Sequence, residues 1–220
     1  MATVSFGVGY EQFSTNWKPM KSEIHRLLAA ASLVLACSIS MASDSVELSL
    51  AHGSPAETQV ESRLLSLLSR YDLSPWTITR RIIIDQNEIP HSHPVLTLHA
   101  RHRNDDELLL STYVHEQLHW WLATKPKETA EAETELRLRY PKIPVGYPEG
   151  SSDDDGNYEH LLVIYLEYRA DQTLLGELKA REVMQFWASD HYTWLYEKVL
   201  SEPDVIGRVV KKYGLSPLRS

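Results

Sequence analysis

The residues best suited to chemistry lie close together at positions 107–124, in the segment ELLLSTYVHEQLHWWLAT. It contains an H-E-x-x-H pattern formed by His115, Glu116 and His119. In an α-helix, residues four positions apart project from the same face, so the two imidazoles can bind one metal ion. Glu116 lies about 100° further round the helix, close enough to hold a water molecule beside that ion. The pattern therefore predicts a catalytic metal site.

The segment 107–124 has the composition of a helix. Leu110, Val114, Leu118 and Trp121 form an apolar stripe at helical spacing, which can face a core. No proline or glycine interrupts the segment, and Pro126 follows it. The alternative interpretation is an ordinary helix whose two histidines and one glutamate are surface or packed polar residues.

A second helix is predicted over residues 158–175, because this stretch is apolar-rich and free of proline and glycine. His160, Ile164, Glu167 and Asp171 fall on one stripe of it. Burying polar groups on one stripe of an otherwise apolar helix is costly in free energy unless those groups are hydrogen-bonded or bind a metal. Packed against the first helix, this stripe offers a third metal ligand, which a catalytic zinc site usually needs.

The two motifs together resemble the gluzincin metallopeptidases, most closely the CAAX prenyl endopeptidase type and its bacterial relatives. There, H-E-x-x-H is followed on a later helix by E-x-x-A-D, which here runs from Glu167 to Asp171. The resemblance implies that His115, His119 and Glu167 bind Zn²⁺, that Glu116 is the general base and that Asp171 orients a ligand histidine. It covers these two helices and departs from those relatives in lacking transmembrane helices around the site, so it implies no substrate class.

His160 leaves the ligand set open. It lies two turns before Glu167 on the same face and is the alternative third ligand, in which case Glu167 supports the ligands from behind. It is also a candidate donor of a hydrogen bond to the transition state. The remaining interpretation is a core histidine bonded to a neighbouring carboxylate.

His191 and Tyr192 are further candidates for catalysis, in a C-terminal segment rich in aromatic residues. Many zincins place a histidine or tyrosine from such a segment over the metal, where it stabilises the developing oxyanion. The alternative for both residues is packing in the core.

The N-terminal 42 residues are predicted to be an extension and a secretory signal peptide. From Met20 the chain has a basic start, a ten-residue apolar run and small residues before Ala42, after which we expect the cut. Cys37, the only cysteine, sits in a poor lipobox, so a lipid anchor is the less favoured alternative. We expect a secreted or periplasmic protein whose single domain spans residues 43–220.

Composition limits the partners. The chain of 220 residues is 43% hydrophobic and 24% charged, as is usual for a globular protein, and carries a net charge of −8. This charge argues against nucleic acid, which needs clustered lysine and arginine. The apolar run near the N-terminus is too short for a permanent transmembrane anchor. We expect a peptide or protein substrate; the sequence gives no indication of oligomeric state.

The remaining segments predict an α+β fold that is mostly helical and zincin-like, with a small sheet before the metal helix and a helical C-terminal half. We expect helices at 56–71 and 127–140, strands at 76–84 and 95–100, one of them an edge that binds a peptide, and two helices within 182–215. The loop 141–157 joins the two site helices and is a candidate lid.

The predicted function is zinc-dependent hydrolysis of a peptide or amide bond, with Glu116 as general base. The competing hypothesis is a non-catalytic secreted protein that binds metal or uses a zincin-like fold for interaction. A closed site with four protein ligands would favour that second hypothesis.

Overall fold

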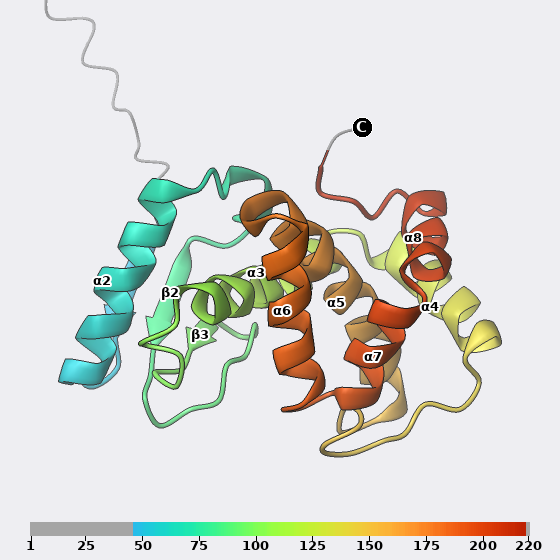
Figure 1. Ribbon diagram of the computed structural model, residues 1–220, viewed down its shortest axis with the longest axis horizontal. Coiled ribbons are helices and arrows are strands. Elements are labelled where there is room, and N and C mark those ends of the chain that lie inside the picture. The colour runs from blue at the N-terminus through green and yellow to red at the C-terminus, as the bar shows by residue number, and fades with distance from the viewer. Residues whose placement is uncertain (1–45, 219–220) are drawn as a thin grey trace, which may run out of the picture. The chain divides into compact units, whose positions relative to one another are not determined.

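The computed structural model describes residues 46–218 (Figure 1). The predicted leader over residues 1–42, including Cys37 and the cut after Ala42, lies outside them. The described part is mostly helical with one small sheet, which confirms the predicted balance of elements. In chain order these elements are β1 (Glu47–Leu50), α2 (Pro55–Arg70), a 3₁₀ turn (Ser74–Trp76), β2 (Arg81–Ile84), β3 (Leu96–Leu98), α3 (Asp106–Ala123), α4 (Pro126–Arg139), α5 (Asp154–Leu175), α6 (Glu177–Ala188), α7 (Thr193–Ser201) and α8 (Pro203–Lys212).

The sheet has three parallel strands in the order β1-β2-β3. Ile82 and Ile84 of β2 pair in register with Leu96 and Leu98 of β3, and all four side chains are buried. Strands of a parallel sheet are usually covered by helices, so their sequences are continuous apolar runs. This pattern is the reason that β2 and β3 could be predicted from the sequence. The first strand, β1, was not predicted; its residues alternate between exposed and half-buried positions.

The predicted strand 76–84 begins later than expected. Trp76 ends the 3₁₀ turn and is buried in the core, and the strand starts at Arg81. Between them, the side-chain amide of Gln117 takes the place of a neighbouring strand. Its Oε1 accepts hydrogen bonds from the backbone N–H groups of residues 78 and 79 at 2.8 and 2.9 Å, and its Nε2 donates to the carbonyl of Thr79 at 2.8 Å.

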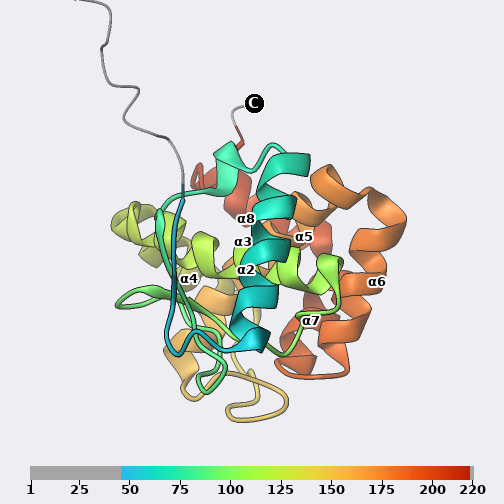
Figure 2. The ribbon, with the colours of Figure 1, turned by 90° about the vertical axis from the view of Figure 1, so that its left-hand side faces the viewer.

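Helix α3 is the centre of the described part. It contacts α2 and β3 on one side and α5 and α6 on the other, so it lies between the sheet layer and the C-terminal helices (Figures 1 and 2). Asp105 caps its N-terminus by accepting hydrogen bonds from the backbone N–H groups of Glu107 and Leu108. Most of its residues are buried, including the whole H-E-x-x-H segment. A helix enclosed in this way fixes the site histidines firmly.

The C-terminal half differs from its prediction in two respects. Helix α5 starts at Asp154 and not at residue 158, because Asp153 caps it by accepting the backbone N–H of Gly156. Acidic side chains in a first helical turn are favourable, so Asp154 and Asp155 belong to the helix and not to the predicted loop. The segment predicted to hold two helices forms part of three, because the chain turns at Tyr192 and again before Pro203.

Within residues 46–218, no helix combines the length and the apolar character needed to cross a membrane.

Candidate metal centre

Three histidine side chains converge at the contact between α3 and α5. His115 and His119 come from successive turns of α3 and His160 comes from the first half of α5. One ring nitrogen of each lies within 4.8 Å of the others. The Nε2 atoms of His115 and His119 are 3.3 Å apart, and the rings of His119 and His160 meet edge-on with centroids 4.9 Å apart. Among the groups predicted to bind metal, the structure therefore brings these three together.

Each of these histidines is held from behind through Nδ1. His115 Nδ1 donates to Glu167 Oε2 at 2.8 Å, and His119 Nδ1 donates to Glu159 Oε1 at 2.7 Å. His160 Nδ1 donates to the carbonyl of Gly156 at 2.7 Å. Hydrogen bonds of this kind fix the tautomer and the orientation of metal-binding histidines.

The consequence of these contacts is that the Nε2 lone pairs of His115 and His119 face each other at 3.3 Å. Two lone pairs at this distance repel unless a cation lies between them, either a proton on one ring or a metal ion shared by both. Burial lowers the pKa of His115 well below its usual range and lowers that of His160 to about 3. Both rings are therefore neutral at pH 7, the form that binds metal. Three imidazoles on one point fit Zn²⁺ well.

His119 differs from the other two. Burial by itself lowers its pKa, but the hydrogen bond to Glu159 and the nearby carboxylate of Glu116 outweigh burial and raise it. His119 is therefore the ring that best tolerates positive charge on its Nε2 side, whether that charge is a proton or a metal ion.

Glu167 lies behind His115 and away from the shared ligand point. Its Oε1 accepts the hydroxyl of Ser111 at 2.5 Å, and its Oε2 accepts both His115 Nδ1 and the hydroxyl of Tyr196 at 3.1 Å. Trp187 Nε1 donates to Ser111 Oγ at 3.0 Å and completes this buried network. Both carboxylate oxygens are occupied, so the geometry favours His160 over Glu167 as the third ligand.

Asp171 does not take the role that the resemblance implies. It is fully buried, and neither of its carboxylate oxygens has a hydrogen-bond partner among the described residues. It therefore orients no ligand histidine. Burial raises its pKa well above the usual range, and the neighbouring Glu167 carboxyl raises it further.

Glu116 borders the same cavity as the three histidines and is 6% exposed. Burial raises its pKa to about 7, with Glu167 adding to the effect and His119 opposing it. A carboxyl that is neither fully protonated nor fully ionised near pH 7 suits proton transfer.

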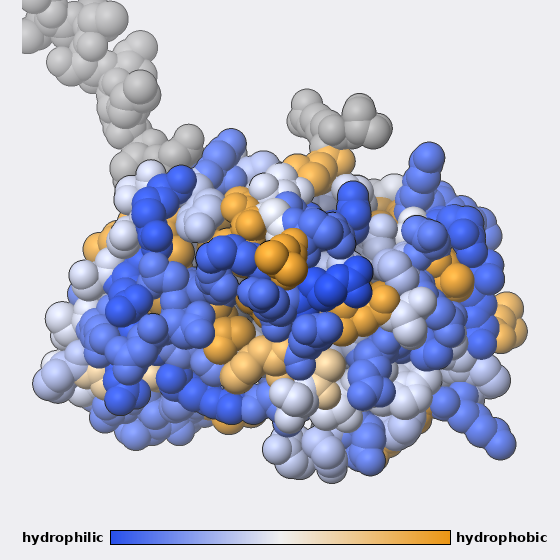
Figure 3. All heavy atoms as spheres, in the orientation of Figure 1, coloured by the Kyte–Doolittle hydropathy of each residue, from blue (hydrophilic) through white to orange (hydrophobic). Residues whose placement is uncertain are grey.

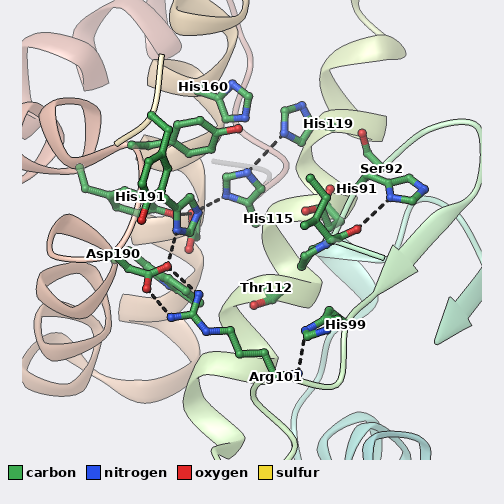
Figure 4. Close-up of a pocket in the computed structure, with 18 of the residues that line it drawn as sticks. His91, Ser92, His99, Arg101, Thr112, His115, His119, His160, Asp190 and His191 are labelled. Atoms are coloured by element: carbon green, nitrogen blue, oxygen red, sulfur yellow. Dashed lines mark hydrogen bonds and ion pairs between the residues drawn. The ribbon is translucent and has the colours of Figure 1, made fainter. Parts of the chain in front are cut away.

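The cavity has a volume of about 640 Å³ and lies between α3, the α6–α7 turn and two loops (Figure 4). His191 and Tyr192 both line it. His191 Nδ1 donates to Asp190 Oδ2 at 2.9 Å, and its Nε2 has no hydrogen-bond partner among residues 46–218. The ring of Tyr192 lies over that of His160 with centroids 4.3 Å apart. Tyr192 adopts a left-handed backbone with φ of 51°, a strained conformation for tyrosine.

Asp190 is held by Arg101, which reaches it from the loop before α3. Both terminal nitrogens of Arg101 donate to the two oxygens of Asp190, one of them at 2.9 Å. These bonds lower the pKa of Asp190 to about 2. Arg101, Asp190 and His191 thus form a chain along one wall of the cavity (Figure 4).

The loop predicted as a lid borders the cavity through Tyr147, Gly150 and Ser152. The middle of its central turn is anchored to α7. The carbonyls of Pro148 and Glu149 accept the first backbone N–H groups of α7, at 2.9 and 3.2 Å. This segment is therefore a fixed wall of the cavity in the structure.

Two groups of site residues were missed from the sequence. Glu159 precedes His160 directly, and an acidic residue beside a candidate ligand is a signal that could have drawn attention to it. The pairing of Arg101 with Asp190 joins residues 89 positions apart and carries no sequence signal.

A second group of potential ligands, His52, Glu57 and Asp85, lies near the N-terminus of α2. Both oxygens of Glu57 accept backbone N–H groups, and His52 is hydrogen-bonded to Asp85. These bonds account for the grouping without a metal.

The chain matches no protein-family model, and neither the curated proteins nor the solved structures contain a significant match to it. The function must therefore be inferred from the geometry of the site.

Proposed function

We propose that this protein is a zinc-dependent hydrolase of peptide or amide bonds, with His115, His119 and His160 as the metal ligands. One observation carries the proposal: two buried imidazoles and one half-buried imidazole present Nε2 to one point, each fixed through Nδ1 by Glu159, Glu167 or the Gly156 carbonyl. This arrangement leaves a fourth position facing a cavity of about 640 Å³. An open fourth position supports catalysis over storage or a structural role.

Zinc at this point would polarise the substrate carbonyl and lower the pKa of the attacking water. Glu116 accepts the proton of that water and passes it to the leaving nitrogen. It suits this task because it follows His115 directly and opens onto the same cavity. Since His160 is used as a ligand, stabilisation of the oxyanion falls to His191 or to the hydroxyl of Tyr192.

The resemblance to gluzincins supports the reaction class and the roles of His115, Glu116 and His119. The ligand set that we propose differs from theirs, because Glu167 becomes the group that orients His115. The predicted leader would place this activity in the periplasm or outside the cell.

The experiment that tests the proposal combines metal content with peptide hydrolysis on the purified protein. We expect close to one zinc per chain by elemental mass spectrometry, together with cleavage of a mixed peptide library. A chelator should abolish cleavage and added zinc should restore it. A protein that binds no zinc after zinc is added back, or that binds it and cleaves nothing, would overturn the proposal.

A further inference from the structure

Two large apolar side chains are exposed at the border of the cavity. Ile89 is 77% exposed and Tyr147 is 82% exposed, and both line the cavity from separate loops. The face drawn in Figure 3 is mostly hydrophilic, with small apolar patches. Single exposed apolar residues are ordinary, but two that border one cavity form a surface suited to an apolar group.

Tyr147 is presented by well-anchored backbone. The side chain of Asn157 is fully buried; it accepts the backbone N–H of Ser151 at 2.7 Å and donates to the carbonyl of Pro144 at 3.0 Å. The residue after Tyr147 is tied to α7 through its carbonyl, which accepts the N–H of Thr193 at 2.9 Å. The backbone at Tyr147 is therefore already ordered, so little further backbone entropy is lost when the residue contacts a ligand.

Ile89 is held in a similar way. Two residues later, His91 pairs with Thr97 of β3 through two backbone hydrogen bonds of 2.8 and 3.1 Å. The Nδ1 atom of His91 also bonds to the carbonyl of Ile89 at 2.9 Å, and Trp120 Nε1 donates to the carbonyl of Ser92. The predicted use of a strand edge for the substrate is thus restricted, because this loop already pairs with the outer edge of β3 at Thr97.

The charges along the cavity are paired. Arg101 is neutralised by Asp190, and burial lowers the pKa of His102 to about 4, so that ring is uncharged at pH 7. His99 donates to the carbonyl of Gln86 through Nε2 and accepts the backbone N–H of Arg101 through Nδ1, which defines a neutral ring. Among the described lining residues, Glu116 is the one carboxyl with no hydrogen bond, and it is assigned to proton transfer.

These pairings bear on where a substrate is cut. Recognition of a free chain end needs a fixed charge opposite the terminal ammonium or carboxylate, because an unpaired charge is costly to desolvate. Apart from Glu116, which the proposed reaction uses, the described lining offers no such unpaired charge. An uncharged internal segment of a polypeptide fits it better than a chain terminus.

Resting on the function proposed above, we infer that the protein is an endopeptidase that cuts inside a chain beside a bulky apolar side chain, with Ile89 and Tyr147 determining this specificity. The two side chains contact the apolar group of the substrate, while the reacting carbonyl lies at the histidine cluster. Loss of one apolar contact in a specificity pocket typically costs about 10-fold or more in kcat/KM.

The test uses peptides blocked at both ends that differ at a single internal position, where phenylalanine, leucine, alanine, aspartate or lysine is placed. Mass spectrometry locates the cut, and the same peptides with free ends are run in parallel. We expect cleavage beside phenylalanine or leucine, at least 10-fold faster than in the alanine and charged peptides, and no advantage from a free end.

Tyr147→Ala and Ile89→Ala should each lower kcat/KM for the phenylalanine peptide about 10-fold. For the alanine peptide, kcat/KM should change less than about threefold. The zinc content of both variants should equal that of the wild type. Tyr147→Phe should restore the preference because it keeps the ring. Matched controls are Leu138→Ala and Leu178→Ala, which remove equally exposed side chains from α4 and α6, away from the cavity; neither should alter the preference.

The two proposals can fail separately. The inference would be overturned by zinc-dependent cleavage that shows no apolar preference or that requires a free terminus. It would also be overturned if Tyr147→Ala had the same preference as Leu138→Ala. Each of these results would leave the hydrolase function intact. Absence of zinc, or of any peptide cleavage, would overturn both.

Discussion

At the residue scale, the site depends on which nitrogen of each histidine is free. Glu159, Glu167 and the Gly156 carbonyl occupy the Nδ1 side of the three rings, so Nε2 is the atom left for a metal. An acidic group behind a ligand increases its basicity and fixes its direction, which makes these partners nearly as important as the ligands.

The third ligand can be identified by comparing His160→Ala with Glu167→Gln. We expect His160→Ala to lose zinc on dialysis, because one of three ligands is removed. Glu167→Gln should still bind zinc, with an affinity reduced by about 10- to 100-fold through poorer orientation of His115. Elemental mass spectrometry and a competitive zinc indicator measure both quantities.

His52→Ala is the matched control for that comparison, since it alters the second histidine–carboxylate grouping; it should leave zinc binding at the wild-type level. Zinc retained in His160→Ala but lost in Glu167→Gln would return the ligand role to Glu167.

The role of Glu116 is tested by Glu116→Gln, which keeps the size of the side chain and removes its basicity. We expect normal zinc content and a fall in kcat of about 10²- to 10⁴-fold, the usual range for losing a general base. Glu182→Gln, an exposed position on α6, should retain full activity. Turnover in Glu116→Gln at the wild-type rate would show that another group moves the proton.

At the element scale, neighbouring residues of α3 have two different roles, one in the site and one in holding the backbone before β2. Its histidines and Glu116 face the cavity, while Gln117 faces the other way and satisfies the backbone of residues 78 and 79. The helix thereby links the proposed metal site to the segment that leads into β2. Its position depends on packing against the sheet on one side and α5 on the other.

Gln117→Ala should therefore lower the free energy of unfolding by about 1–3 kcal/mol, because it leaves backbone groups without partners. Chemical denaturation with a two-state fit measures the change. The exposed Gln185→Ala on α6 provides the same chemical change at a surface position and should stay within about 0.5 kcal/mol of wild type. Equal stability of the two variants would mean that water replaces the Gln117 amide at no cost.

At the scale of the whole molecule, the proposed metal joins α3 to α5, which themselves connect the sheet layer to the C-terminal helices. A ligand that binds the folded state alone stabilises it by about 2.7 kcal/mol when present at 100 times its Kd. For a domain of this size that corresponds to a rise in Tm of roughly 5–10 °C.

We therefore expect zinc to raise the Tm of the chelator-treated protein by roughly 5–10 °C in differential scanning calorimetry. The double variant His115→Ala/His119→Ala should show no such rise, because the two ligands from α3 are gone. A rise of the same size in the double variant would place the stabilising zinc elsewhere.

The sequence by itself determined the local features of this protein. The H-E-x-x-H spacing, the apolar stripe of the first site helix and the continuous apolar strands depend on helical and strand periodicity, which are local properties. They sufficed to predict a mostly helical fold with a small sheet and to nominate His115, Glu116, His119 and His160.

The tertiary structure decided what depends on the packing of distant segments. The choice between His160 and Glu167 follows from where α5 crosses α3, since the two residues share one face of α5 but lie about 10 Å apart along its axis. The pairing of Arg101 with Asp190, and the meeting of Ile89 and Tyr147 at one cavity, join loops far apart in the chain. Periodicity sets which face of a helix is apolar, but the contacts between elements set which polar groups on that face meet.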